Sequence, residues 1–329
     1  MTTLLMSDKT ATVRRAPAAG GAARVNRPRD TNSHRVIRRR QLFAWLFIAP
    51  AIVYVAIFFG YPIVNNLTMS FQDFTTTTFY TGEAPWVGFD NYVSVVSSAL
   101  FARLSVNTAV FTILSLAVTF VIGMLLALFF NAHFKLSGLL RSLILLPWLL
   151  PLIISAAVWR RMMDEGSGIL NQILSSVGIG SVPWLTNPDV ALFSIIIVNV
   201  WIGIPFTMVI LYGGLQEIPT EYYEAASLDG ATGWNSFRYI TWPLLRPVVA
   251  VVLILGFVYT IRVLDIILAL TGGGPANSTQ TYATQAYQLS FVDFKFGVGA
   301  ALSNILIVVS LLVAALQLRT SRRSNDLAG

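Results

Sequence analysis

Six long apolar segments constrain the fold of this 329-residue chain more than any other feature of its sequence. They cover approximately residues 42–64, 106–130, 139–158, 190–212, 248–270 and 299–318. A bilayer core about 30 Å thick needs about 20 apolar residues in a helix, and each segment reaches that length. Only 11% of the residues are charged, against about 25% in ordinary soluble domains. We therefore expect an all-α polytopic membrane protein with six transmembrane helices, rather than a soluble domain or a barrel of short alternating strands.

Lysine and arginine are distributed unevenly along the chain. Ten of the 22 lie within residues 1–40, and most of the others fall in loops that six spans would place on the same side as the N-terminus. The positive-inside rule then predicts that both termini are cytoplasmic. The predicted organisation is a basic disordered cytoplasmic tail (1–40), a transmembrane domain (41–320) and a second cytoplasmic tail (321–329).

The basic tail contains Arg39-Arg40 directly before an apolar segment, a pattern that also occurs in twin-arginine export signals. Five further apolar segments follow, and the first is longer than the apolar region of a typical signal peptide. We therefore interpret the tail as a basic leader whose cations lie near the anionic inner leaflet. No aromatic residue is interleaved with its basic residues, so the sequence does not predict a nucleic-acid partner.

The residue types that carry covalent or metal catalysis are scarce. The chain has no cysteine, and His34 and His133 are its only histidines, which excludes thiolate sites and is too few for a histidine-built metal site. Its one glycine-rich run, Gly272 to Gly274, lacks the lysine of a phosphate-binding loop. We expect no catalytic residue, no metal ligand and no ATPase site in this chain.

The most polar stretch between spans is the inner loop at residues 213–247. Pro219 suits the first position of a helix, where its missing N–H is not needed. The sequence from Glu221 to Asp229 predicts a short helix, closed by Gly230 in the left-handed conformation. A second short helix is expected from about Trp234 to Ile240, ending before Trp242-Pro243. The loop is therefore predicted to be a bent pair of helices on the cytoplasmic surface.

These loop residues resemble the EAA loop in the membrane subunits of binding-protein-dependent ABC importers. The resemblance rests on Glu224-Ala225-Ala226-Ser227-Leu228-Asp229-Gly230-Ala231, followed by Phe237, Ile240, Pro243 and Pro247. A second stretch, Leu270 to Pro275 with Asn277, Ser278 and Thr279, is similar to a segment of the carbohydrate branch of that family, the maltose, trehalose and glycerol-phosphate type. Weaker similarities to the family occur at Val87 to Tyr92, Asn107-Thr108 and Gly168 to Asn171. The resemblance therefore covers about residues 40 to 318.

The resemblance implies a coupling helix that a cytoplasmic ATPase holds in a cleft. On this interpretation Glu224 and Gly230 are central to the joint, with Ala225, Ala226 and Asp229 as supporting positions. It also implies the partners: a second permease subunit forming a heterodimer, an ABC ATPase dimer that binds ATP and magnesium, and an extracytoplasmic solute-binding protein. The expected location is the bacterial inner membrane. A plain solvated connector is the alternative interpretation of this loop.

Polar groups inside the spans mark candidates for a substrate pathway, because such groups are costly at bilayer depth unless they face a cavity or a partner. Tyr259, Arg262 and Asp265 are three residues apart in the predicted fifth span, so they share a helical face and the two charges can pair. Asn199 and Trp201 in the fourth span are further candidates for holding a sugar. A structural ion pair and ordinary aromatic packing remain equally open interpretations.

Proline predicts breaks in two spans. The fourth contains Gly203 and Pro205, where we expect a kink, and the third contains Pro147 and Pro151, where we expect a broken stretch. Irregular backbone in a membrane is tolerated only where protein or water covers it, so both places are candidates for the border of a cavity.

The sequence therefore predicts a permease subunit that passes a sugar or related polyol from an external binding protein to the cytoplasm, driven by ATP hydrolysis on its partners. An ion-gradient-driven secondary transporter is the alternative. That class predicts carboxylates inside several spans, whereas only Asp265 qualifies here. A membrane-embedded enzyme would need clustered catalytic groups, and the sequence shows none.

Overall fold

The computed structural model describes residues 45–132 and 134–326. The predicted basic tail therefore lies outside the described residues, as do His133 and the last three residues. The chain divides into two compact units, with the boundary after Gly60. In the first unit the described residues are helical and end in the π-helix η1 (Ala56–Gly60), and none of their side chains is buried.

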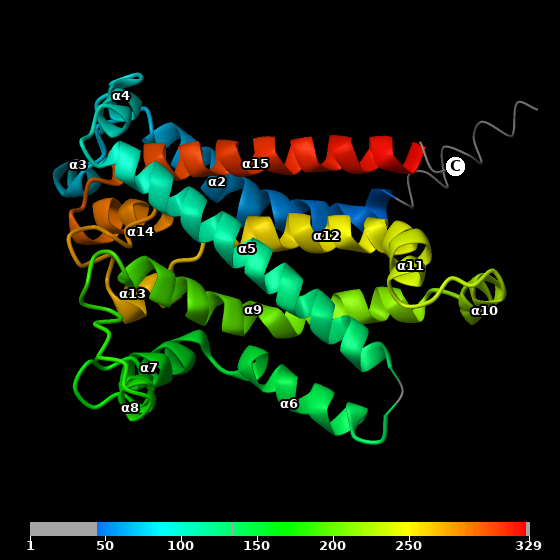
Figure 1. Cartoon of the computed structure of the whole chain (residues 1–329). Coiled ribbons are helices and arrows are strands. Elements are labelled where there is room, and N and C mark those ends of the chain that lie inside the picture. Colours follow the sequence, from blue (N-terminus) through cyan, green and yellow to red (C-terminus); the bar gives the residue numbers. More distant parts are fainter. Residues whose placement is uncertain (1–44, 133, 327–329) are drawn as a thin grey trace, which may run out of the picture. The chain divides into compact units, whose positions relative to one another are not determined.

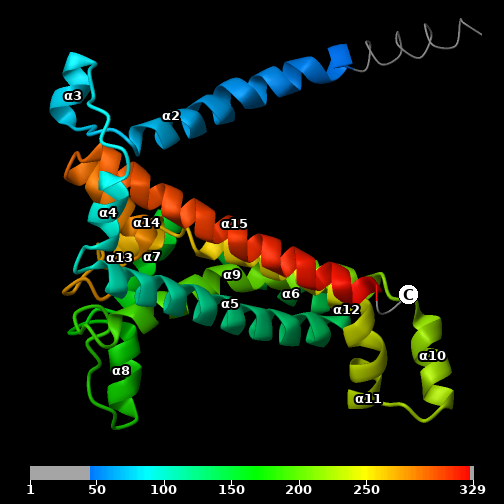
Figure 2. The same cartoon turned by 90° about the horizontal axis from the view of Figure 1, so that it is seen from above.

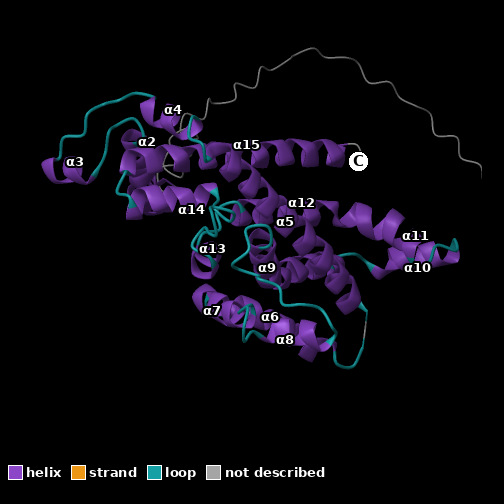
Figure 3. Cartoon of the chain, turned by 60° about the vertical axis from the view of Figure 1, so that its left-hand side comes forward, coloured by secondary structure: helices purple, strands orange, loops and turns teal. Residues whose placement is uncertain are grey.

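The described part of the second unit consists of helices and loops, with one isolated bridge between Gln72 and Trp86 (Figures 1 and 3). Its elements are α2 (Tyr61–Met69), α3 (Thr76–Thr81), α4 (Asp90–Val96), α5 (Phe101–Asn131), α6 (Ser137–Leu149), α7 (Leu152–Met162), α8 (Ile169–Ser176), α9 (Ala191–Gln216), α10 (Thr220–Leu228), α11 (Trp234–Ser236), η2 (Phe237–Thr241), α12 (Trp242–Thr260), α13 (Asp265–Leu270), α14 (Tyr282–Tyr287), η3 (Gln288–Val292) and α15 (Phe296–Asp326). Helices α5, α9, α12 and α15 are the long members of this unit.

The long helices α5 and α9 pack along each other through small residues. A Cβ atom added to Gly123 of α5 would lie 2.6 Å from Cγ2 of Thr207 on α9, and one added to Gly203 of α9 would lie 3.1 Å from Cγ2 of Thr119 on α5. Small residues allow this close backbone approach. In lipid the hydrophobic effect does not drive helices together, so van der Waals contacts of this kind hold them. The reciprocal contact fixes the register of the two helices.

Five helices of the described residues are long and apolar enough to cross a membrane: Trp45–Met69, Phe101–Asn131, Ala191–Gln216, Trp234–Thr260 and Phe296–Arg319. The pair α6 and α7 meets the same test only when taken together, and is bent by 97° at its break. The break follows Pro147 and ends at Pro151, so the broken stretch predicted for the third segment is confirmed. At the other predicted kink, α9 continues uninterrupted through Gly203 and Pro205, and its backbone is not unwound.

The predicted fifth span, residues 248–270, is not one continuous helix. Helix α12 ends at Thr260, and a short turn separates it from α13. At the other end, the helix expected to stop before Trp242-Pro243 instead continues through η2 into α12. A proline ring clashes with the carbonyl four residues earlier in an α-helix. For Pro243 that carbonyl belongs to Tyr239, inside the wider π turn, which explains why the helix does not break there.

Candidate functional site

Helix α10 and its flanking loop extend from one end of the second unit (Figures 1 and 2). Helices α4, α8, α13 and α14 lie at the opposite end of the same unit. The loop between α9 and α11 is shorter than the predicted 213–247, because α9 continues to Gln216 and helical structure resumes at Trp234. The candidate coupling element is therefore residues 217–233, with α10 at its centre.

The ends of α10 follow the local chemistry of their residues. Pro219 is the N-cap, one position before the predicted one, and its φ of −60° suits the start of a helix. At the other end Gly230 adopts φ +79°, as predicted for a left-handed C′ residue. Its N–H donates to the Ser227 carbonyl at 3.1 Å, and the Ala231 N–H donates to the Ala226 carbonyl at 2.9 Å. These two bonds form a Schellman motif.

The residues predicted to meet the ATPase are accessible. Glu224, Ala225, Asp229 and Gly230 are exposed, and Ala226 is half-buried. Among the residues that the structure describes, apart from its two neighbours in the chain, none would lie within 4 Å of a Cβ atom added to Gly230. The space beside this glycine is therefore open to a partner.

Helix α10 is anchored to the long helices by one aromatic residue. The hydroxyl of Tyr223 and Oγ1 of Thr241 lie 2.9 Å apart in a hydrogen bond, and the Tyr223 ring packs against the buried cluster that contains Met208, Leu211 and Leu245. Thr241 stands directly before α12. This contact links α10 to the candidate span Trp234–Thr260.

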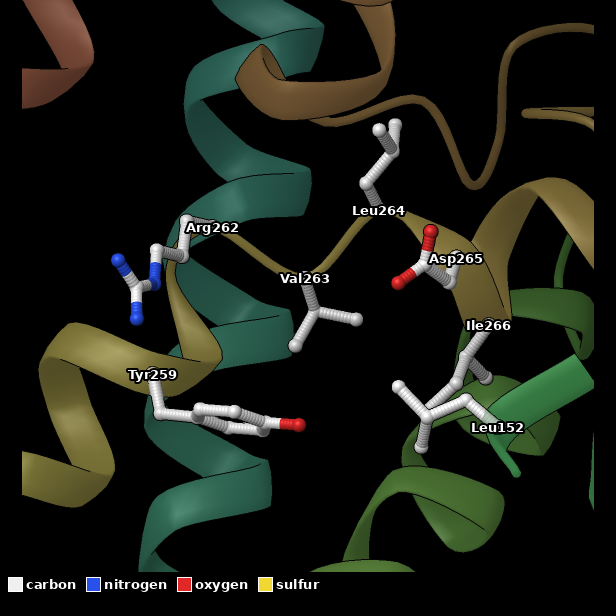
Figure 4. A pocket seen from close by; sticks show the side chains of 7 residues that line it. All are labelled: Leu152, Tyr259, Arg262, Val263, Leu264, Asp265 and Ile266. Atoms are coloured by element: carbon white, nitrogen blue, oxygen red, sulfur yellow. The ribbon is translucent and has the colours of Figure 1, made fainter. Parts of the chain in front are cut away.

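A pocket of about 300 Å³ lies where α12 and α13 are separated (Figure 4). It is lined by Leu152, Tyr259, Arg262, Val263, Leu264, Asp265 and Ile266. Leu152 is the first residue of α7, so the pocket joins the two places where long helical segments are broken. Its volume is at the lower end of the range for small-molecule sites, about 300 to 1,000 Å³.

The three pathway candidates of the predicted fifth span are all at this pocket, but not in the predicted arrangement. Because α12 ends at Thr260, Tyr259, Arg262 and Asp265 do not share one helical face. Figure 4 shows the Tyr259 hydroxyl and the Asp265 carboxylate directed toward the same space, whereas the Arg262 guanidinium points away from it. Within the described residues no ion pair joins Arg262 to Asp265, so the structure does not support the ion-pair interpretation of these two charges.

The two remaining pathway candidates do not line this pocket. Asn199 is buried within α9. Trp201 packs edge-on against Trp159 of α7, with 5.6 Å between the ring centroids, and belongs to the margin of a buried cluster that includes Ile266 and Ile267. These contacts favour the packing interpretation for Trp201.

The structure also brings together two motifs that are distant in the sequence. Nδ2 of Asn107 on α5 donates to the carbonyls of Asn277 at 3.1 Å and Gln280 at 2.9 Å, and Oγ1 of Thr108 accepts from the Tyr282 N–H at 3.0 Å. The glycine-rich segment from Gly272 thus continues into a loop held by α5. Both motifs are visible in the sequence, but their contact could not be predicted because no local pattern encodes it.

The comparison with known proteins identifies the family. A family described as binding-protein-dependent transport system inner membrane component matches residues 119–325, more than half of the chain. The chain belongs to this family. The resemblance to this family is therefore confirmed, and the family together with the apolar helices makes the chain an integral membrane protein.

Relatives in this family cover nearly the whole chain. The trehalose/maltose transport system permease protein MalF of Thermococcus litoralis is 36% identical, over 88% of this chain and 96% of its own length. The sulfoquinovosyl glycerol transport system permease protein SmoG of Agrobacterium fabrum is 32% identical, over 87% and 92%. Among solved structures, a chain of a bacterial ABC transporter that imports the acidic polysaccharide alginate has a TM-score of 0.77 and 26% identity, covering 89% of this chain and 99% of that one.

Proposed function

We propose that this chain is a permease subunit of an ABC importer and that it passes a sugar or related polyol into the cytoplasm. A partner ATPase dimer that binds ATP and magnesium supplies the energy, and a second permease subunit completes the pathway. An extracytoplasmic binding protein delivers the solute, and the complex resides in the bacterial inner membrane. The observation that carries the proposal is the exposed α10, which presents Glu224 and an open Gly230 at one end of the second unit.

The sugar class is supported by the named relatives. The printed names of two of them specify trehalose/maltose and sulfoquinovosyl glycerol, and a third relative, DasB of Streptomyces coelicolor, is a diacetylchitobiose uptake permease 28% identical to this chain. Membership in a binding-protein-dependent family favours the ATP-driven machine over the ion-driven secondary transporter.

Co-purification tests the machine, and a ligand screen tests the cargo. A tagged chain extracted in mild detergent is expected to retain a second permease and an ATPase whose hydrolysis rises when the binding protein and its solute are added. Sugars and polyols are then screened by thermal shift on the binding protein. Retention of no ATPase, or a screen in which only non-carbohydrate solutes bind, would contradict the corresponding half of the proposal.

Single substitutions at the pocket test its role in the pathway. We expect Asp265→Asn to raise, by about tenfold, the concentration of solute-loaded binding protein at which uptake is half-maximal. The reason is that a hydrogen bond to a charged group contributes about 1.5 to 3 kcal/mol. Arg262→Gln is the matched control, since this exposed side chain lines the same pocket but points away from it. It is expected to change that concentration by less than about threefold, the effect of an ordinary surface substitution.

The melting temperature of both variants is measured in the same preparation. Equal effects of the two substitutions on uptake, or an Asp265→Asn effect that only follows a loss of stability, would remove this pocket from the pathway.

A further inference from the structure

A second pocket, of about 580 Å³, lies at the end of the second unit that carries α10 and α11. Its lining consists of aromatic residues, one proline and two arginines, and includes no acidic residue: Trp234, Phe237, Arg238, Tyr239, Trp242, Pro243 and Arg246. The candidate coupling helix contributes none of these residues. The pocket therefore needs an explanation separate from α10.

The aromatic wall of this pocket is built by the π turn η2. Trp234 and Phe237 are stacked, with ring centroids 5.2 Å apart, and Phe237 lies 6.2 Å from Trp242. The Arg238 guanidinium carbon lies 5.7 Å from the centroid of the Tyr239 ring. The result is an aromatic surface with cationic groups beside it.

The position of the pocket across the membrane follows from the length of the helix that carries it. The candidate span Trp234–Thr260 has 27 residues, which corresponds to about 40 Å at 1.5 Å per residue. This exceeds the hydrocarbon core of about 30 Å and equals the core plus its headgroup layers. Arg246 is the last charged residue before the apolar remainder of α12. The pocket occupies the first half of this helix and so includes the end that reaches the headgroup layer, where Trp and Tyr concentrate.

Both arginines of the pocket are exposed, and within the described residues neither forms an ion pair. A guanidinium presents a fork of donors that matches phosphate oxygens. Basic pockets beside transmembrane helices at an anionic leaflet suit acidic lipid headgroups.

We propose that this pocket binds an anionic phospholipid of the adjacent leaflet. Its phosphate lies between Arg238 and Arg246, and its acyl chains follow Trp242 and Pro243 toward the membrane core. The distribution of lysine and arginine predicts that this leaflet is the cytoplasmic one, which is the anionic one. The inference requires a membrane-spanning chain and is independent of the transported solute.

Lipid titration of the purified complex tests this inference. The complex is stripped of lipid in detergent, and binding of dioleoyl-phosphatidylglycerol and dioleoyl-phosphatidylcholine is followed by native mass spectrometry. We expect the wild-type complex to prefer phosphatidylglycerol. The double variant Arg238→Gln/Arg246→Gln is expected to bind it about 30-fold more weakly, since each basic residue near the surface contributes about one kcal/mol.

Three controls make the result specific. Lys135→Gln removes an exposed charge from the loop between α5 and α6 without touching the pocket, and is expected to bind phosphatidylglycerol like the wild type. Arg238→Lys/Arg246→Lys keeps the charge and is expected to retain most of the binding, which separates charge loss from misfolding. Glycerol phosphate, a headgroup without acyl chains, is expected to compete poorly.

Four outcomes would overturn the inference. Equal affinity for the two lipids, or unchanged phosphatidylglycerol binding by the double glutamine variant, would show that the arginines do not select an anionic lipid. Full competition by glycerol phosphate would assign the site to a soluble phosphate. Loss of the ATPase from the double variant with lipid binding intact would assign the surface to a protein partner.

Discussion

Replacing Gly230 with leucine is expected to lower the amount of ATPase retained by the complex by at least about tenfold, and to abolish uptake, while the chain remains inserted in the membrane. No other part of the described chain fills the space beside Gly230, so a new side chain enters the region that a partner would occupy. Retained ATPase is measured by quantitative blotting after co-purification, and uptake with labelled solute.

Gly178→Leu is a closely matched control for this substitution. Gly178 follows α8 at φ +80°, against +79° for Gly230, and a Cβ atom there would also meet nothing within 4 Å. Its N–H donates to the Ser175 carbonyl and the Ile179 N–H to the Leu174 carbonyl, the same pair of bonds that closes α10. A side chain in the left-handed conformation lowers the free energy of unfolding by about 1 to 2 kcal/mol, and this loss is the same in both variants.

The comparison therefore isolates the partner contact from backbone strain. Helix α8 lies at the end of the second unit opposite α10 (Figure 1), so Gly178→Leu is expected to keep the ATPase. Equal ATPase loss from both variants, or normal retention by Gly230→Leu, would mean that α10 is only a solvated connector.

A large loss of stability is expected from Gly168→Ala. A Cβ atom at this position would overlap the Asp164 carbonyl oxygen and lie 2.5 Å from the Met162 carbonyl oxygen. Both obstacles are backbone atoms, which no side-chain rotation can move away. We expect the free energy of unfolding to fall by about 3 kcal/mol and the melting temperature by about 10 °C, measured by differential scanning fluorimetry in detergent.

Gly166→Ala provides the control within the same loop, because a Cβ atom there would lie 4.0 Å from Oδ1 of Asp164, an ordinary van der Waals distance. It is expected to change the free energy of unfolding by less than about 0.5 kcal/mol. If the two variants melt at the same temperature, the close backbone approach at Gly168 is not a constraint.

The loop before Gly168 has little freedom to relax around a new side chain. Oδ1 of Asp164 accepts from the Ser167 hydroxyl at 2.6 Å and the Ser167 N–H at 2.8 Å. These bonds, with a smaller attraction from Arg161, lower the pKa of the Asp164 carboxyl. A lowered pKa stabilises the folded loop at neutral pH, and this contribution is lost only as the pH falls through the folded-state pKa.

Local chemistry explains which features could be predicted from sequence. The apolar segments give most of the long helices, Gly230 marks the end of α10, and Pro147 and Pro151 mark the broken third segment. Each of these depends on residues that are close in sequence: an apolar run, a glycine after a helix, or a proline that removes a helical hydrogen bond.

The structure differs from the sequence-based predictions where packing between distant residues decides it. Hydropathy continues from α12 into α13, so it gave no sign that the helix ends at Thr260 and that Arg262 turns away from Asp265. Pro243 was expected to end a helix, but the π turn before Trp242 lets the helix continue past it. The contact of Asn107 with the loop at Asn277 joins positions 170 residues apart, which no short sequence window can reveal.

The most direct test of the central claim is the side of the membrane on which α10 lies. Because the chain contains no cysteine, Ser227→Cys introduces a single exposed thiol on α10, and Ser176→Cys a single exposed thiol on α8 at the opposite end. An impermeant maleimide added to right-side-out vesicles is expected to label Ser176→Cys at once and Ser227→Cys only after permeabilisation. Labelling of Ser227→Cys in sealed vesicles would place α10 outside the cell, beyond the reach of a cytoplasmic ATPase, and would contradict the account.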